Sequence, residues 1–496
     1  MSPLILILTS ALISVLFLLY HRRVVSKYDR LSIPPGPPGN IFSGVKNQLS
    51  PSPWLKYAQW AEHYKSPVIS FWVYNRRTIV LNDHKSIRDL LDMRANSYSD
   101  RPKSWMYHDL CGRGNTVFNI SSLDNRHAMY RRLLKHGLSG RAIREYHGLL
   151  ENEADVLVDG LAQEPESFQH HLRRNAAAVI MRVAYGYTLT ENDDPFISVA
   201  EESAKISGWA LAPGRWLVDY YPSLRFIPRW VPFAGFRRQG EEWRRQLDSL
   251  SDVPHKWVKA QMEQGDYVES FTSRFIQSNS IGDENPDEIV KWAAGGLYAG
   301  ASDTTVSALT SFILLMALYP QVQQQAQREI EGLCGPGKQP SPSDLHKLHY
   351  LNAVYREVLR YAPVSNIALP HRVIQDDVYE CYKIPKDSTV IANTWAVLHD
   401  PALYPEPFRF NPSRFIDDAL IGAGTGNEQP EFNPDPRAYC FGYGRRTCPG
   451  LQFAETSSLL VMSRVLSRFN VSLPVGTDAP EVEFTPGITS HIKPST

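Results

Sequence analysis

One cysteine, set between glycines in an arginine-bearing decapeptide, constrains this 496-residue chain more than any other feature. The segment reads Phe441-Gly442-Tyr443-Gly444-Arg445-Arg446-Thr447-Cys448-Pro449-Gly450. Metals bind the thiolate form of cysteine, which nearby cations and a helix N-terminus favour. Residues 451–469 have amphipathic helical spacing and Pro449 suits a first helical position, so we expect Cys448 at the positive end of that helix. An isolated cysteine can also be a small buried hydrophobe, but these neighbours favour a metal ligand next to a flat group that Gly444 and Gly450 allow to approach.

The decapeptide matches the pattern Phe-x-x-Gly-x-Arg-x-Cys-x-Gly at every fixed position, and so resembles the signature of the cytochrome P-450 family. The resemblance implies that Cys448 is the axial thiolate ligand of the iron in haem b (heme b), and that Arg446 pairs with a haem propionate. It also implies that Phe441, Gly442 and Gly450 belong to the cofactor-binding set. An anionic sulfur ligand pushes electron density onto iron and favours O–O cleavage.

A second motif lies inside residues 287–318, which we expect to form one long helix with an unusually apolar middle. Small residues in the run 300–305 weaken a helix but let a flat group lie against it, and Asp303 and Thr304 place an acid and an alcohol in this apolar setting. The run resembles the family's oxygen-binding motif, which implies that Thr304 hydrogen-bonds dioxygen and that Asp303 relays protons. The alternative is a core helix with a chance acid and alcohol. Ala301 stands where the family usually has a second glycine.

A third motif is structural. Glu357 and Arg360 lie three residues apart on one helix face, a spacing that alone is often only a surface pair. Together with Arg414 it resembles the family's Glu–Arg–Arg triad, which implies a frame that holds the loop before the cysteine segment. We do not expect these residues to be catalytic.

Two further positions resemble family contacts to the haem propionates. Residues 126–132 resemble the helix whose Trp-x-x-x-Arg pair contacts the haem, and Arg131 matches its arginine. His371 matches a contact found in many relatives, with Arg372 as the alternative. His127 stands where the family usually has tryptophan, so we expect one propionate contact to be changed or lost.

Helical patterns dominate residues 125–360, while residues 68–73, 78–81 and 388–392 have short strand patterns. The sequence therefore predicts a mainly α protein with small β-sheets, and the resemblance implies the cytochrome P-450 fold. Segments that the resemblance places near substrate are residues 99–122, 297–305, 364–369 and 485–490. Their apolar and small residues suit a largely apolar substrate.

The N-terminus predicts a membrane anchor. Residues 3–20 are almost wholly apolar and would span about 27 Å as a helix, close to the hydrocarbon core of a bilayer. Basic residues follow, which places that flank in the cytosol; a cleaved signal peptide is the alternative, but a basic leader and a small-x-small cleavage site are missing. We predict a transmembrane helix over 1–20, a basic and Pro-rich linker over 21–40 that acts as a spacer, and a haem-binding monooxygenase domain over 41–496. This organisation predicts a single-pass protein of the endoplasmic reticulum membrane with a cytosolic catalytic domain.

Composition excludes several other classes. Lys plus Arg and Asp plus Glu both number 52, so nothing indicates nucleic-acid binding. Five cysteines without a Cys-x-x-Cys pair argue against a disulfide framework and a structural zinc site. The chain has no flavin or nicotinamide fingerprint, so electrons must come from a partner.

The resemblance, which covers about residues 30–490, implies a membrane-anchored monooxygenase that inserts one oxygen atom from O2 into a lipophilic small molecule. It implies NADPH–cytochrome P-450 reductase as the electron donor, and basic residues around 131–135 predict either its docking face or a solvated helix face. Two segments, residues 216–230 and 392–400, resemble fungal microsomal members of the O-methylsterigmatocystin oxidoreductase type. The aromatic residues 216–230 predict either a second membrane contact or an ordinary packed loop. That similarity implies terpenoid, polyketide or alkaloid secondary metabolism. The alternatives are a haem–thiolate isomerase or dehydratase that does not use O2, and a catalytically impaired haem-binding relative with a shortened sheet edge after residue 490.

Overall fold

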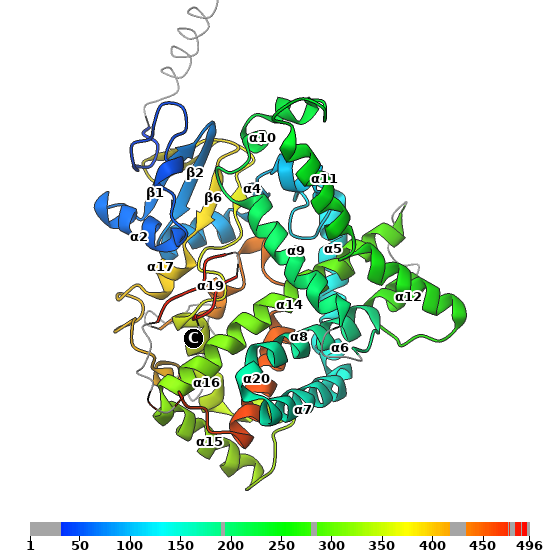
Figure 1. Ribbon diagram of the computed structural model, residues 1–496. Coiled ribbons are helices and arrows are strands. Elements are labelled where there is room, and N and C mark those ends of the chain that lie inside the picture. Colours follow the sequence, from blue (N-terminus) through cyan, green and yellow to red (C-terminus); the bar gives the residue numbers. More distant parts are fainter. Residues whose placement is uncertain are drawn as a thin grey trace, which may run out of the picture.

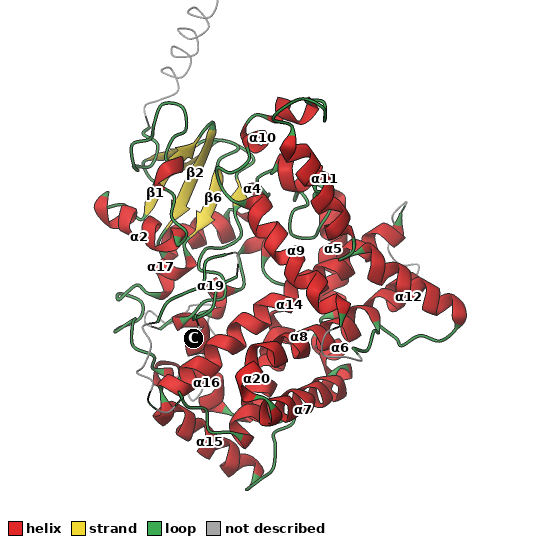
Figure 2. Ribbon diagram, in the orientation of Figure 1, coloured by secondary structure: helices red, strands yellow, loops and turns green. Residues whose placement is uncertain are grey.

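The computed structural model describes residues 31–189, 194–278, 285–416, 433–474, 476, 482–487 and 489–493. Over these residues the chain is mainly helical and carries one four-stranded and one two-stranded sheet, as predicted (Figure 2). The predicted anchor, its basic flank to residue 30 and most of the Gly-rich stretch 421–436 lie outside the described residues.

The elements are as follows. The helices of four or more residues in the α class are α2 (Pro53–His63), α3 (His84–Ile87), α4 (Ala95–Tyr98), α5 (Asn125–Gly137), α6 (Gly140–Glu145), α7 (His147–Gln163), α8 (Phe168–Tyr185), α9 (Pro195–Leu211), α10 (Leu217–Tyr220), α11 (Gly235–Asp248), α12 (Asp252–Gln264), α13 (Phe271–Gln277), α14 (Pro286–Leu318), α15 (Pro320–Cys334), α16 (His349–Tyr361), α17 (Thr394–Leu398), α19 (Arg437–Cys440) and α20 (Leu451–Arg468). The strands are β1 (Val68–Val73), β2 (Arg76–Leu81), β3 (His371–Arg372), β4 (Asp377–Tyr379), β5 (Tyr382–Ile384) and β6 (Thr389–Ala392).

Helix α14 runs through the middle of the helical part and packs against α5, α8, α16 and α20 (Figure 1). It begins one residue earlier than predicted, where Pro286 occupies the first turn and the Asn285 side chain accepts a hydrogen bond from the Glu288 N–H at 3.4 Å. Among the described helices it is the one long and apolar enough to cross a membrane, but half of its most apolar stretch is buried inside the fold. Its neighbours identify it as the core helix.

The larger sheet joins distant parts of the chain. β1 and β2 form the predicted antiparallel hairpin, with Val68 opposite Leu81. β6 then lies parallel to β2, and β3 lies antiparallel to β6. The sheet thus brings the segment that carries His371 beside the N-terminal hairpin.

The Pro-rich run packs along β1. The Ser70 N–H donates to the Pro35 carbonyl at 2.8 Å, and the Ser70 hydroxyl donates to the Pro34 carbonyl at 2.6 Å. A Cβ on Gly36 would lie 1.7 Å from the Ser70 carbonyl oxygen. Over these residues the run therefore packs on the folded domain.

Candidate active site

Cys448 lies in the loop between α19 and α20. Its N–H donates to the Phe441 carbonyl at 2.6 Å, which closes the loop around the cysteine. Helix α20 begins at Leu451 with Gly450 as its N-cap, so Pro449 lies outside the helix, and the prediction that it takes the first helical position is wrong. Gly450 takes the N-cap position, so Cys448 lies two residues before the cap.

The Cys448 side chain is exposed to solvent, although many protein atoms lie near its sulfur. Burial raises the pKa of Cys448, while the Gly450 N–H and the positive charge of Arg131 lower it, and burial prevails. The predicted stabilising contacts are therefore present but do not by themselves make a thiolate. A bound metal would convert Cys448 to the thiolate, because a thiol that coordinates a metal loses its proton.

Two neighbouring glycines shape this loop. Gly444 has φ +53°, its N–H donates to the Asp92 carboxylate at 2.7 Å, and a Cβ there would lie 2.4 Å from the Leu91 carbonyl oxygen. A Cβ on Gly450 would lie 3.8 Å from the Cys448 sulfur. Glycine at the first position lets the loop dock against residues 88–95, whereas a side-chain carbon at the second position would make only an ordinary van der Waals contact with the sulfur.

The predicted Glu–Arg–Arg triad is assembled and buried. Arg360 donates to both carboxylate oxygens of Glu357 at 2.8 and 2.9 Å, and the Arg414 guanidinium lies 3.1 Å from the same carboxylate. Glu357 also accepts the Asn411 N–H at 2.9 Å, and Arg360 donates to the Pro407 carbonyl at 2.8 Å. The triad therefore ties α16 to the loop at residues 405–414, as predicted.

Positive charge gathers on one side of the cysteine loop. Burial lowers the pKa of Arg446 to about 10, with repulsion from Arg131 and Arg445 adding to the effect and Asp100 opposing it. Burial likewise lowers the pKa of Arg101 to about 9, and Arg446 adds to that shift. Both guanidinium groups stay charged at neutral pH. Asp100 is itself paired with an arginine of β3, so the cluster retains positive charge that would attract an anion.

The arginines of this cluster hold their positions through backbone carbonyls. Arg446 donates to the carbonyls of Ser99, Val117 and Ile120 at 2.8, 3.3 and 2.5 Å. Arg101 donates to the carbonyls of Phe118, Leu369 and Pro370 at 3.0, 2.7 and 2.7 Å. Neither set of contacts neutralises the charge. Arg101 was not singled out from the sequence, because its partners lie far away in the chain and it belongs to no motif that we recognised.

The two histidines predicted near the propionates belong to the same cluster. Burial, followed by repulsion from the arginines, lowers the pKa of His127 to about 4, and its buried Nε2 has no hydrogen-bond partner within the described residues. Burial lowers the pKa of His371 to about 3, and its Nδ1 lies 2.7 Å from the Tyr98 carbonyl. Arg372, the alternative to His371, is bound by the carboxylates of Asp100 and Asp387.

The acid–alcohol pair lies on α14. The Thr304 hydroxyl donates to the Gly300 carbonyl at 2.8 Å, and its side chain is exposed although the following residues 306–311 are buried. Asp303 accepts a hydrogen bond from the Thr489 hydroxyl in the C-terminal segment. Thr304 can thus be reached by a small molecule, while the carboxylate beside it is held by a partner 186 positions away.

Loop residues 117–120 connect the two halves of the site. Arg446 binds the carbonyls of this loop from the cysteine side. On the other side, a Cβ on Gly296 would lie 2.4 Å from Val117, and one on Gly300 would lie 3.2 Å from the Phe118 ring. Gly296 and Gly300 of α14 therefore leave room for an apolar loop. The small residues of 300–305 were predicted to leave room for a flat group.

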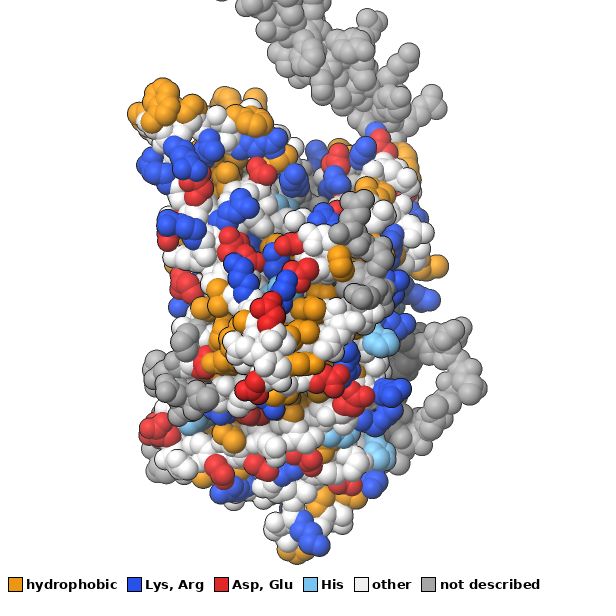
Figure 3. Space-filling model, turned by 90° about the vertical axis from the view of Figure 1, so that its right-hand side faces the viewer, with side chains coloured by type: hydrophobic (Ala, Val, Ile, Leu, Met, Phe, Trp, Pro, Cys, Tyr) orange, Lys and Arg blue, Asp and Glu red, His pale blue; other side chains and the backbone are white. Residues whose placement is uncertain are grey.

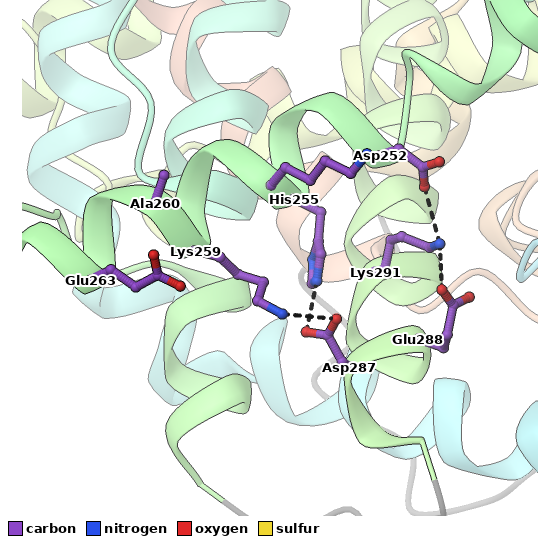
Figure 4. A pocket seen from close by; sticks show the side chains of 9 residues that line it. Asp252, His255, Lys259, Ala260, Glu263, Asp287, Glu288 and Lys291 are labelled. Atoms are coloured by element: carbon purple, nitrogen blue, oxygen red, sulfur yellow. Dashed lines mark hydrogen bonds and ion pairs between the residues drawn. The ribbon is translucent and has the colours of Figure 1, made fainter.

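A surface pocket between α12 and α14 is a separate feature (Figure 4). Asp287 pairs with His255 at 2.9 Å and with Lys259 at 3.2 Å, while Lys291 pairs with Asp252 at 3.0 Å. Asp287 lies 16 residues before Asp303, about 24 Å along the helix axis. These paired charges join two helices and lie apart from Asp303 and Thr304.

The residues present fit a haem. The Cys448 side chain is exposed, and the two propionates would meet arginines and a buried histidine nitrogen that has no hydrogen-bond partner among the described residues. A mainly helical fold with this donor set defines the haem–thiolate class of protein.

Comparison with known proteins agrees. The family model for Cytochrome P450 matches residues 34–496, and the chain belongs to this family. Similar proteins include Cytochrome P450 monooxygenase claR of Ampulloclitocybe clavipes, 36% identical over 94% of this chain and 86% of the relative. Tryptamine 4-monooxygenase of Psilocybe cyanescens is 34% identical over 94% of this chain and 92% of the relative, and Cytochrome P450 monooxygenase ppsD of Aspergillus oryzae is 33% identical over 93% and 87%. The chain is thus a cytochrome P450 monooxygenase with a haem cofactor, similar to fungal members.

Proposed function

We propose that the chain is a membrane-anchored haem–thiolate monooxygenase of fungal secondary metabolism that takes electrons from NADPH–cytochrome P-450 reductase. The observation that carries the proposal is the loop 117–120, which joins the Arg446 side of the cysteine loop to the helix of Asp303 and Thr304. It supports a single site with a thiolate on one side and an acid–alcohol pair on the other.

Cys448 would ligate the haem iron, and Arg446, Arg131 and His371 would hold the propionates, with Arg101 and His127 of the same cluster beside them. The haem supplies the redox chemistry that activates dioxygen. The remaining work falls to this chain: the arginines orient the cofactor, and the contacts with Asp92 and Phe441 fix the loop that carries Cys448.

On the substrate side, Thr304 would donate its hydroxyl proton after leaving the Gly300 carbonyl, and Asp303 would return to Thr304 a proton that it takes up from solvent. Val117, Phe118 and Ala301 present apolar surface next to this pair, which supports a lipophilic substrate. One similar protein is a tryptamine 4-monooxygenase, and we propose a terpenoid, polyketide or alkaloid substrate.

An exposed aromatic tip supports membrane attachment. Phe226, Trp230 and Phe233 are 70, 81 and 98% exposed in the segment between α10 and α11, where Figure 3 shows hydrophobic side chains gathered at the top of the molecule. Ile41 and Phe42, 79 and 80% exposed, precede β1, and this early part of the domain lies at the same end in Figure 1. Such patches suit a membrane interface, and we propose attachment to the endoplasmic reticulum with the domain in the cytosol.

The test is expression of the full chain in microsomes with the reductase, with Cys448→Ser as the comparison. We expect the wild type to give the long-wavelength band of the reduced carbon-monoxide spectrum and to turn over members of a terpenoid, polyketide and indole panel only with NADPH and O2. A Cys448→Ser protein that keeps this band would overturn the ligand assignment, and product formed without O2 would overturn the reaction class.

A further inference from the structure

The C-terminal segment forms a hairpin that closes on α14. Phe484 pairs with Ile492 in antiparallel fashion, and the Lys493 N–H donates to the Glu483 carbonyl at 2.8 Å. Two bonds fix the hairpin to the core: the Ser490 N–H donates to the Val364 carbonyl at 2.7 Å, and the Ile492 N–H donates to the Ser311 hydroxyl at 3.2 Å. The tip of the hairpin is therefore held next to α14 by contacts that do not involve Asp303.

From this tip, the Thr489 hydroxyl donates a hydrogen bond to the Asp303 carboxylate. Asp303 directly precedes Thr304, whose own hydroxyl is bound to the Gly300 carbonyl. A hydrogen bond to an ionised acceptor is stronger and more directional than a neutral one. The carboxylate next to the alcohol is thus oriented by a residue that the sequence placed only in a segment near substrate.

We propose that Thr489 is a positioning residue of the oxygen-handling site, which fixes the carboxylate of Asp303 so that it can take up a proton from solvent and pass it on to Thr304. The inference rests on the proposed function of Asp303 and deepens it. A proton donor must be held within hydrogen-bond reach of its acceptor, and a carboxylate on a helix can otherwise rotate towards solvent.

The charged surroundings agree with this role. His491, two residues after Thr489, has Asp303 of α14 and Arg173 of α8 as its charged neighbours. Arg173 is itself paired with Glu201 at 3.1 Å. Asp303 therefore accepts a hydrogen bond from the Thr489 hydroxyl, and its charge acts on the pKa of His491.

The test compares Thr489→Val, which removes the hydroxyl at nearly constant shape, with Thr489→Ser, which keeps it. Lys493→Ala breaks only the exposed pair with Glu483 on the same hairpin and serves as the control. Thr489→Val should lower the amount of product formed per NADPH by about 3- to 10-fold, and peroxide should rise correspondingly. This is smaller than the usual effect of removing a general acid, because Thr489→Val removes only the orientation of the proton donor. KM and the reduced carbon-monoxide spectrum should stay unchanged, and Thr489→Ser should restore coupling. Unchanged coupling in Thr489→Val would overturn the proposal.

A second measurement needs no turnover. We expect the loss of Tm in the double variant of Thr489→Val and Asp303→Asn to be smaller than the two single losses added together, because both changes break one contact. Additive losses would show that the hydroxyl and the carboxylate do not interact, and would overturn the inference. If instead the chain forms no product at all while the losses are non-additive, the contact stands and the proposed function fails.

Discussion

Replacing Glu357 by glutamine would test how strongly the buried triad holds the loop before the cysteine. Glu357 and Arg360 are fully buried, and the carboxylate receives two hydrogen bonds from Arg360 and one from the Asn411 N–H, besides the Arg414 pair. Glutamine keeps the shape but has one acceptor oxygen and no charge. Two guanidinium groups would then remain buried without a counter-charge.

The expected loss is large. Breaking a buried ion pair by removing one partner costs about 3–5 kcal/mol. Unfolding entropy of about 2.1 cal/mol/K per residue gives about 1 kcal/mol per kelvin for a domain of roughly 460 residues, so Tm should fall by about 3–5 °C. Because the triad binds the loop at 405–414, we also expect a smaller fraction of the protein to show the thiolate band of the reduced carbon-monoxide spectrum.

The assay is a thermal scan of the haem-loaded protein together with that spectrum. Glu406→Gln is the matched control, because Glu406 also pairs with an arginine three residues away, Arg409 at 3.3 Å, but both side chains are at least 66% exposed. An exposed ion pair of this kind contributes at most about 1 kcal/mol to the free energy of unfolding. Equal Tm losses in the two variants would refute the reasoning that burial makes the triad matter.

Three further outcomes follow from the site. Thr304→Ala should keep haem binding but divert reducing equivalents from product to peroxide; unchanged coupling would contradict its role. Arg101→Leu should speed haem transfer to apomyoglobin by about 10- to 100-fold, the equivalent of one charged hydrogen bond of about 1.5–3 kcal/mol, whereas Lys103→Leu in the same loop should not. Asp303→Asn should lower the pKa of His491 further, because burial already lowers that pKa and the Asp303 charge is what opposes it; histidine C2–H exchange followed by mass spectrometry would show it, and a raised pKa would be inconsistent with this account.

Local patterns were enough to predict much of this fold. The long helix α14 and the hairpin of β1 and β2 were predicted from the periodicity of neighbouring residues. The triad of Glu357 was predicted from its resemblance to a family motif, since Arg414 lies far along the chain from Arg360. The exact start of α20 was not, since helix ends depend on the cap, and here Gly450 takes that place.

Contacts between distant segments could not be predicted. Arg101 binds the carbonyl of Leu369, and Thr489 binds Asp303, across 268 and 186 positions respectively. Neither pair has a spacing or composition that marks it, because tertiary packing alone brings the partners together. The same is true of Pro35, whose carbonyl is bound by a strand that begins 33 residues later.

The order in which the chain leaves the ribosome matters for the larger sheet. β2 pairs in parallel with β6, so Thr78 can pair with Thr389 only after the ribosome has added more than 300 further residues. At about 5–20 residues per second, the hairpin of β1 and β2 would be exposed with an unpaired edge for about 15–60 s during synthesis. An unpaired strand edge is a template for aggregation. Full-length yield should therefore depend on chaperones and translation speed, and fragments that stop before β6 should aggregate.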